Sequence, residues 1–152
     1  MSSEKTLFLE DLPVGAVLTS APRVISAEDI ADFCRLSGDW NPLHTDDDWV
    51  RANTPFRERI AHGLLVLGAS SGTPCPEMDA LLIIAYLSES RSFRAPTYPG
   101  DAITTTWTVT ESRPSQSKPD RGLVRFDVRC TKDDGTVVQD GEDLLLVARR
   151  PS

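Results

Sequence analysis

The sequence predicts an α+β fold in which one antiparallel sheet wraps around a long central apolar helix. Three observations carry this prediction. Helix signals are confined to the first half of the chain, strand patterns begin near residue 81, and the helical run 60–72 has no charged residue and is apolar nearly all round. A helix of that composition is buried on most of its sides. Strands joined by short turns pair antiparallel, so the apolar helix is expected across their inner face.

The first half of the chain contains three helix signals. Ser26 stands three residues before the carboxylate of Asp29, which is the capping-box pattern, and apolar residues then recur at helical spacing. Residues 46–48 are all Asp, and carboxylates favour the positive end of a helix dipole, so a short helix is expected to begin there. The third signal is the apolar run 60–72.

The second half of the chain follows strand patterns. We expect strands at residues 81–86, 103–110, 124–130 and 137–149. The first is an uninterrupted apolar run and predicts a buried strand, whereas 124–130 alternates strictly between apolar and charged side chains. Gly141 is expected to form a bulge in the last strand. Residues 7–23, broken by proline and glycine, are expected to be extended.

Length and charge exclude several classes of protein. A chain of 152 residues predicts a single domain, 1–152, and its net charge of −7 without a basic cluster argues against binding to nucleic acid. The three cysteines stand in no metal-binding spacing, which predicts no metal site and a reducing compartment. No apolar run approaches the roughly 20 residues of a membrane span, and the first residues do not form a signal peptide. We therefore expect a soluble, cytoplasmic protein that does not contact a membrane.

Candidate functional residues surround the only two histidines. Asp39 and His44 lie five residues apart on either side of a proline, so a bent loop could bring both to one small molecule and its water. The structural alternative is that Asp39 caps a turn and His44 is an ordinary loop histidine. His62 and Gly63 open the apolar helix, whose free N–H groups attract developing negative charge. The structural alternative for Gly63 is that it only allows close packing.

Two blocks carry a family resemblance. Residues 37–44 (SGDWNPLH) and 59–64 (RIAHGL) closely resemble the MaoC-like dehydratases, a family that includes the R-specific enoyl-CoA hydratases. Weaker matches at residues 9–15, 92–96 and 99–101 extend the resemblance over almost the whole chain. The resemblance implies a hotdog fold, in which an antiparallel sheet wraps a central helix. This agrees with the architecture predicted from the residue patterns.

The resemblance also implies roles for single residues. Asp39 and His44 match the catalytic acid/base pair, and Gly63 matches the glycine whose N–H polarises a thioester carbonyl. Asn41 is expected to orient the loop. Ser71 aligns with a serine that supports the site in some members, and His62 is the motif histidine, for which a structural role is expected. Val50 and a His44-to-Gly63 spacing one residue longer than in some hydratases depart from the pattern.

The expected activity is reversible hydration of a trans-2-enoyl thioester to the (R)-3-hydroxyacyl thioester, with CoA thioester as substrate and no cofactor. Two alternatives remain open: a hotdog thioesterase, and a subunit that binds acyl-CoA without catalysis. The sequence identifies neither the acyl chain nor which of Asp39 and His44 is the base. A homodimer or higher homo-oligomer is expected, because the apolar residues 81–86 would be unfavourable at a solvated sheet edge.

Overall fold

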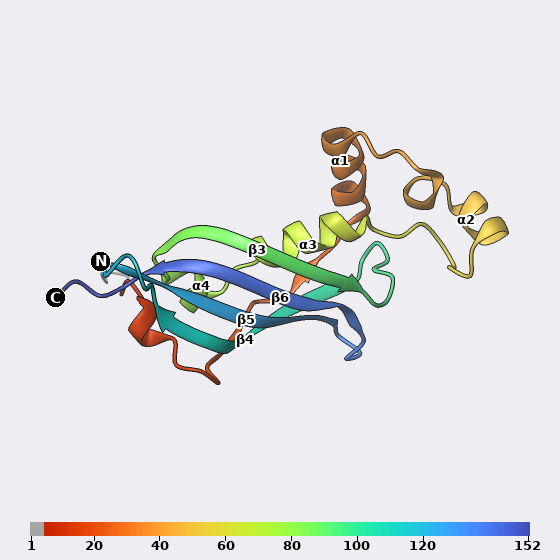
Figure 1. The fold of residues 1–152 in the computed structure, drawn as a ribbon. Helices are drawn as coiled ribbons and strands as arrows, with labels where there is room; N and C mark the ends of the chain where they lie inside the picture. The colour runs from red at the N-terminus through yellow and green to blue at the C-terminus, as the bar shows by residue number, and fades with distance from the viewer. Residues whose placement is uncertain (1–4) are drawn as a thin grey trace.

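Four long antiparallel strands dominate the structure, a computed structural model that describes residues 5–152 (Figure 1). The strands are β3 (Ile83–Phe93), β4 (Ala102–Pro114), β5 (Arg121–Lys132) and β6 (Val137–Ala148). Two short strands, β1 (Val17–Thr19) and β2 (Arg23–Val24), both pair with β4, and the remaining order is β4-β5-β6-β3. This places β3 at one edge of the sheet. Residues 1–4 of the predicted domain lie outside the described residues.

The alternating pattern of β5 is confirmed. Val124, Phe126, Val128 and Cys130 are all at most 2% exposed. The bulge predicted at Gly141 is wrong, because this residue pairs in regular register with Val128. A Cβ at Gly141 would instead run into the carbonyl oxygen of Ser90 on β3. The glycine is therefore explained by a close approach of two strands.

The prediction that residues 81–86 form a buried strand is wrong. Residues 83–86 form the beginning of β3, whose only strand partner among the described residues is β6, and residues 81–82 precede the strand. Ile84 is 41% exposed, Tyr86 56% and Leu87 48%. The uninterrupted apolar run reflects an edge strand with an uncovered apolar side rather than a strand buried between neighbours.

The helices begin where their capping residues predict. α1 (Ala27–Ser37) has a complete capping box between Ser26 and Asp29 and ends at Gly38, which is left-handed with φ 78°. In α2 (Asp47–Asn53), the Asp46 side chain accepts a hydrogen bond from the Trp49 N–H. The other helical segments are η1 (Leu9–Asp11), η2 (Pro42–His44), α3 (Gly63–Gly72) and α4 (Pro76–Ala80).

The apolar helix α3 is shorter and more exposed than predicted. It begins at Gly63 because the backbone just before it is bonded to other segments: the Ile60 N–H donates to the Leu43 carbonyl and the Ala61 N–H to the Thr97 carbonyl. Only Val66 and Ser70 are buried in α3, and Leu64 is 63% exposed. The helix packs on the sheet through one side, and within residues 5–152 nothing covers the other. Figure 1 shows α1 and α2 beyond α3, at one end of the sheet.

The core has two apolar clusters, and the smaller one supports the site. It joins Ile30 of α1 and Val66 of α3 to side chains of three strands, namely Ile103, Cys130 and Val138. The two helices that border the site are thus anchored on the same part of the sheet. All three cysteines are buried free thiols. Within the described part of the chain, no helix is both long and apolar enough to cross a lipid bilayer.

Candidate active site

The loop after α1 is shaped by side chains that bind backbone two residues further on. The Ser37 hydroxyl accepts from the Asp39 N–H at 3.1 Å, and the Asp39 carboxylate accepts from the Asn41 N–H at 3.1 Å. The Asn41 side chain accepts from the Leu43 N–H at 2.9 Å and caps η2. Such bonds fold a chain locally, without help from distant residues. Asn41 therefore makes the contact expected of a residue that orients the loop.

This loop brings Asp39 and His44 together. Asp39 Oδ2 lies 3.7 Å from His44 Nε2, with the carboxylate side chain half exposed and the imidazole nearly buried. His44 Nδ1 lies 2.8 Å from the Ile60 carbonyl oxygen, which can only accept a hydrogen bond, so Nδ1 carries the proton. The Nε2 lone pair then faces the Asp39 carboxylate. At 3.7 Å the two atoms are too far apart for a direct hydrogen bond, but close enough to share a water molecule.

His62 packs behind this pair. Its ring is stacked on that of His44, with centroids 3.7 Å apart and planes tilted by 25°. Its Nε2 lies 3.1 Å from the backbone oxygen of Asp39, and it is 3% exposed. Burial lowers the pKa of His62, partly offset by the hydrogen bond to Asp39.

Asp39, His44 and His62 are also the only described residues whose ligand atoms gather as a possible metal site, within 4.8 Å of one another. The geometry is poor for a cation. A metal ion lies in the plane of each imidazole that binds it, and these two planes are nearly parallel and separated by the stacking distance. His62 Nε2 is also engaged with the Asp39 carbonyl. The arrangement suits proton transfer better than metal binding.

Gly63 lies at the mouth of a cavity beside His44. As the first residue of α3, it has an N–H with no carbonyl acceptor within the helix. A Cβ on Gly63 would come within 2.9 Å of the Phe93 ring, so the position has no room for a side chain unless Phe93 moves. The Gly63 carbonyl accepts a hydrogen bond from Gln139 Nε2 at 2.7 Å. Phe93 and Gln139 thus hold the first turn of α3 against the sheet.

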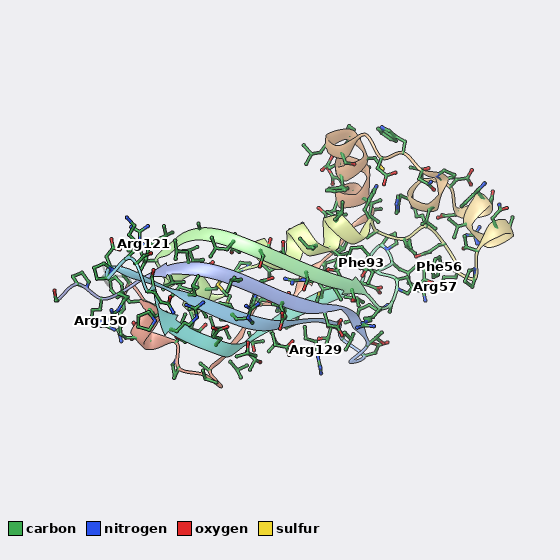
Figure 2. All side chains as sticks on the ribbon, viewed as in Figure 1. Phe56, Arg57, Phe93, Arg121, Arg129 and Arg150 are labelled. Carbon is green, nitrogen blue, oxygen red and sulfur yellow. The ribbon has the colours of Figure 1, made fainter. Side chains whose placement is uncertain are left out.

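The cavity measures about 360 Å³ and is mainly apolar. Its polar groups include His44 and Gln139, and its apolar wall includes Leu43, Phe56, Val66, Phe93 and Val138. Figure 2 shows Phe93 near the end of β3 and Phe56 in the segment after α2, so the cavity wall combines residues of two different segments. An apolar cavity with an imidazole and a free N–H at its mouth suits an acyl chain whose polar end stays at the mouth.

Comparison with known proteins agrees with this geometry. The family described as "MaoC like domain" matches residues 10–128. The chain belongs to the MaoC-like dehydratase family.

Two relatives of this MaoC-like dehydratase match it over most of both chains. A 3-hydroxybutyryl-CoA dehydratase of Methylorubrum extorquens is 36% identical over 96% of this chain and 87% of its own. An (R)-specific enoyl-CoA hydratase of Rhodospirillum rubrum is 37% identical over 94% and 93%. A Mycobacterium tuberculosis protein with a double hotdog fold superposes with a TM-score of 0.83, at 20% identity, over 97% of this chain and 46% of that one. The hotdog fold is confirmed, and the protein is an enzyme of the hydratase and dehydratase class.

The structure does not bring every predicted residue of this MaoC-like dehydratase to the site. Ser71 lies in the last turn of α3, roughly 12 Å along the helix axis from Gly63. It is exposed, donates to the Gly68 carbonyl at 2.8 Å, and does not line the cavity. Within one chain, Ser71 therefore supports neither the acid/base pair nor Gly63.

Sequence reasoning missed Gln139 and Phe93. They are neighbours across β6 and β3, and each lies far from Gly63 along the chain. Gln139 did leave a signal. It is a polar residue at an inward position of β6, on the same face as the buried Leu145 and Val147. A polar side chain at a core position needs a partner, and here the partner is the Gly63 carbonyl.

Proposed function

We propose that this enzyme reversibly hydrates a trans-2-enoyl-CoA to the (R)-3-hydroxyacyl-CoA. The observation that carries the proposal is the 3.7 Å separation of His44 Nε2 from the Asp39 carboxylate, beside an apolar cavity that Gly63 also lines. The names of the two curated relatives support the same chemistry.

In this proposal, Asp39 and His44 hold one water molecule between them. One residue takes a proton from the water as its oxygen bonds to C3 of the enoyl thioester. The C2–C3 π electrons move toward the thioester, and the proton removed from the water is then delivered to C2 through the pair, which returns both residues to their starting state. The Gly63 N–H donates to the thioester oxygen while negative charge develops there, which is worth about 3–4 kcal/mol in the transition state for one such donor. The net reaction adds one water molecule without a net change in oxidation state, so we propose that no cofactor or metal takes part.

Coenzyme A is the carrier we propose for the acyl group. The net charge of −7 opposes the docking of an acidic carrier protein. The free thiols of all three cysteines fit a reducing compartment, so the cytoplasm is the location we propose.

The decisive experiment is a spectrophotometric assay with enoyl-CoA thioesters from C4 upward. Hydration removes the absorbance of the conjugated thioester, and a chiral separation of the product is expected to give the (R) isomer. A thiol reagent run in parallel measures free CoA. Release of CoA at the rate of substrate loss would indicate a thioesterase, and binding without turnover would indicate a non-catalytic subunit. Either result would contradict the proposal.

We also propose that two copies pair through β3 into a homodimer. β3 has a free hydrogen-bonding edge, and exposed apolar side chains lie on it and on α3: Ile84, Tyr86, Leu87, Phe93 and Leu64. A second copy pairing antiparallel would satisfy the edge and cover these side chains. Because Phe93 lines the cavity, the partner would help to close it.

Light scattering coupled to size exclusion tests the dimer. The wild-type protein is expected at twice the monomer mass or a multiple of it. The double variant Tyr86→Lys with Leu87→Lys would bring positive charges of both copies together at the proposed interface. It is expected to shift the protein toward monomer. A wild-type protein that is a monodisperse, active monomer would contradict the proposal.

A further inference from the structure

His62 contacts both members of the acid/base pair without facing the cavity. On the part of the chain that the structure describes, the cavity lining includes His44 and Gly63 but not His62. The His62 ring covers one face of the His44 ring at 3.7 Å, and its Nε2 lies 3.1 Å from the Asp39 backbone oxygen. One buried side chain therefore touches the imidazole of one partner and the backbone of the other.

The hydrogen bond determines the tautomer of His62. The Asp39 carbonyl oxygen can only accept, so His62 Nε2 carries the proton. His62 Nδ1 is buried and has no hydrogen-bond partner within residues 5–152. A second proton on Nδ1 would thus create a buried charge without a partner, which is strongly unfavourable.

The surroundings of His62 also oppose protonation. The titratable groups that face it are the Cys34 thiol of α1, with Sγ at 3.6 Å from Nε2, and the side chains of Asp39 and His44. The Phe33 ring closes the remaining side, with centroids 4.8 Å apart. Burial lowers the pKa of His62 most, and His44 lowers it further, while Asp39 acts in the opposite direction.

We infer that His62 is a positioning residue that holds the acid/base pair as a neutral Nε2–H imidazole. The Ile60 carbonyl fixes one edge of the His44 ring, and His62 fixes its face. With both restraints, His44 Nε2 can point only toward the Asp39 carboxylate. A charged His62 would place a positive charge against the face of the His44 ring whenever that ring holds a second proton, so the neutral form is part of the role. The kinetic part of this inference rests on the proposed hydratase activity.

Two substitutions separate the two contacts. His62→Gln places an amide donor near the Nε2 position but removes the ring, and His62→Phe keeps a ring for stacking but removes the donor. Because small displacements of catalytic groups cost up to about 100-fold in rate, each variant is expected to lower kcat about 10- to 100-fold with little change in KM. His62→Ala removes both contacts and is expected to be the slowest.

A matched control separates positioning from stability. Val124→Ala shortens a buried side chain of β5 in the larger apolar cluster, which contains no residue of the site, and it is expected to lower the melting temperature without lowering kcat. Full kcat in both His62→Gln and His62→Phe would overturn the inference. A fall in kcat for Val124→Ala as large as theirs, at the same loss of melting temperature, would also overturn it.

Nuclear magnetic resonance tests the tautomer without any substrate. The chain has only two histidines, so the imidazole nitrogen signals that disappear in His62→Phe belong to His62. In the wild-type protein these signals are expected to keep the shifts of a neutral Nε2–H imidazole through the pH range in which a free imidazole becomes protonated. Protonation of His62 at the pH at which a free imidazole becomes protonated would overturn the inference, and so would a neutral Nδ1–H tautomer. If the enzyme hydrates no enoyl-CoA, the proposed function fails while this measurement still decides the state of His62.

Discussion

The two sides of the candidate active site are built in different ways. The side that carries Asp39 and His44 is a loop whose shaping hydrogen bonds join residues two apart in sequence. The opposite side joins Gly63, Phe93 and Gln139, which are separated by 30 residues or more and meet only because the sheet is folded. The loop is therefore a local structure that a short motif can encode. The cavity wall is a tertiary structure, and substitutions should affect the two sides differently.

The largest effect is expected in the loop, from the pair itself. Asp39→Asn and His44→Ala are each expected to lower kcat by about 10²–10⁴-fold, the usual contribution of a general acid or base. Folding should be little affected, because the loop keeps its backbone hydrogen bonds and Asp39 is half exposed. The rate of crotonyl-CoA hydration measures the loss of kcat, and circular dichroism of each variant checks that it is folded. A wild-type rate in either variant would remove that residue from the mechanism.

On the cavity wall, the largest effect is expected from Gly63→Val. The larger side chain would collide with the Phe93 ring and crowd the N–H at the cavity mouth, so we expect at least about a 100-fold loss of kcat. Phe93 is 58% exposed and can move aside, so the variant should remain soluble and folded.

The double variant Gly63→Ala with Phe93→Leu sharpens this test. The smaller leucine side chain at position 93 removes the collision, so the double variant should recover the melting temperature that Gly63→Ala alone loses. Its kcat should stay low, because the methyl group still crowds the Gly63 N–H. Normal kinetics in a well-folded Gly63→Val would contradict the oxyanion role.

The contrast between the two sides also explains what could be predicted from the sequence. Capping residues determine helix starts locally, so Ser26 and Asp46 predicted α1 and α2 correctly. The Asp39–His44 pair was predicted for the same reason. By contrast, an apolar run does not reveal whether its strand lies inside a sheet or at an edge, and β3 was therefore assigned the wrong environment. Gly141 and Gln139 depend on partners in other elements, Ser90 of β3 and Gly63 of α3, that no local pattern indicates.

A smaller effect is expected from Gln139, because it acts on Gly63 rather than on the substrate. Gln139→Leu removes the hydrogen bond to the Gly63 carbonyl and should lower kcat about 10-fold. The free energy of unfolding should change by only about 1 kcal/mol, since the lost bond is offset by removal of the buried, unpartnered Oε1. Steady-state kinetics and urea denaturation measure both quantities.

Gln139→Glu is the matched control for this contact. Its carboxylate would face the Gly63 carbonyl oxygen, so this variant should have a lower kcat than Gln139→Leu at neutral pH. Protonation at acidic pH restores a donor, so its rate relative to the wild type should then rise. A rate for Gln139→Leu equal to that of the wild type would show that Gly63 is held without Gln139.

The smallest effect is expected from Asn41, although it lies between Asp39 and His44, the proposed acid/base pair. Asn41→Ala loses the cap of η2 and should destabilise the protein by about 1 kcal/mol. Two hydrogen bonds of the loop remain in this variant: the His44 N–H still donates to the carbonyl of residue 41, and the N–H of residue 41 still donates to the Asp39 carboxylate. The kcat should therefore fall only a few-fold. Asn41→Asp retains the acceptor and should match the wild type in thermal stability. A 100-fold loss of kcat in Asn41→Ala, with stability intact, would instead give Asn41 a direct part in the chemistry and would break the distinction between residues that shape the loop and residues that react.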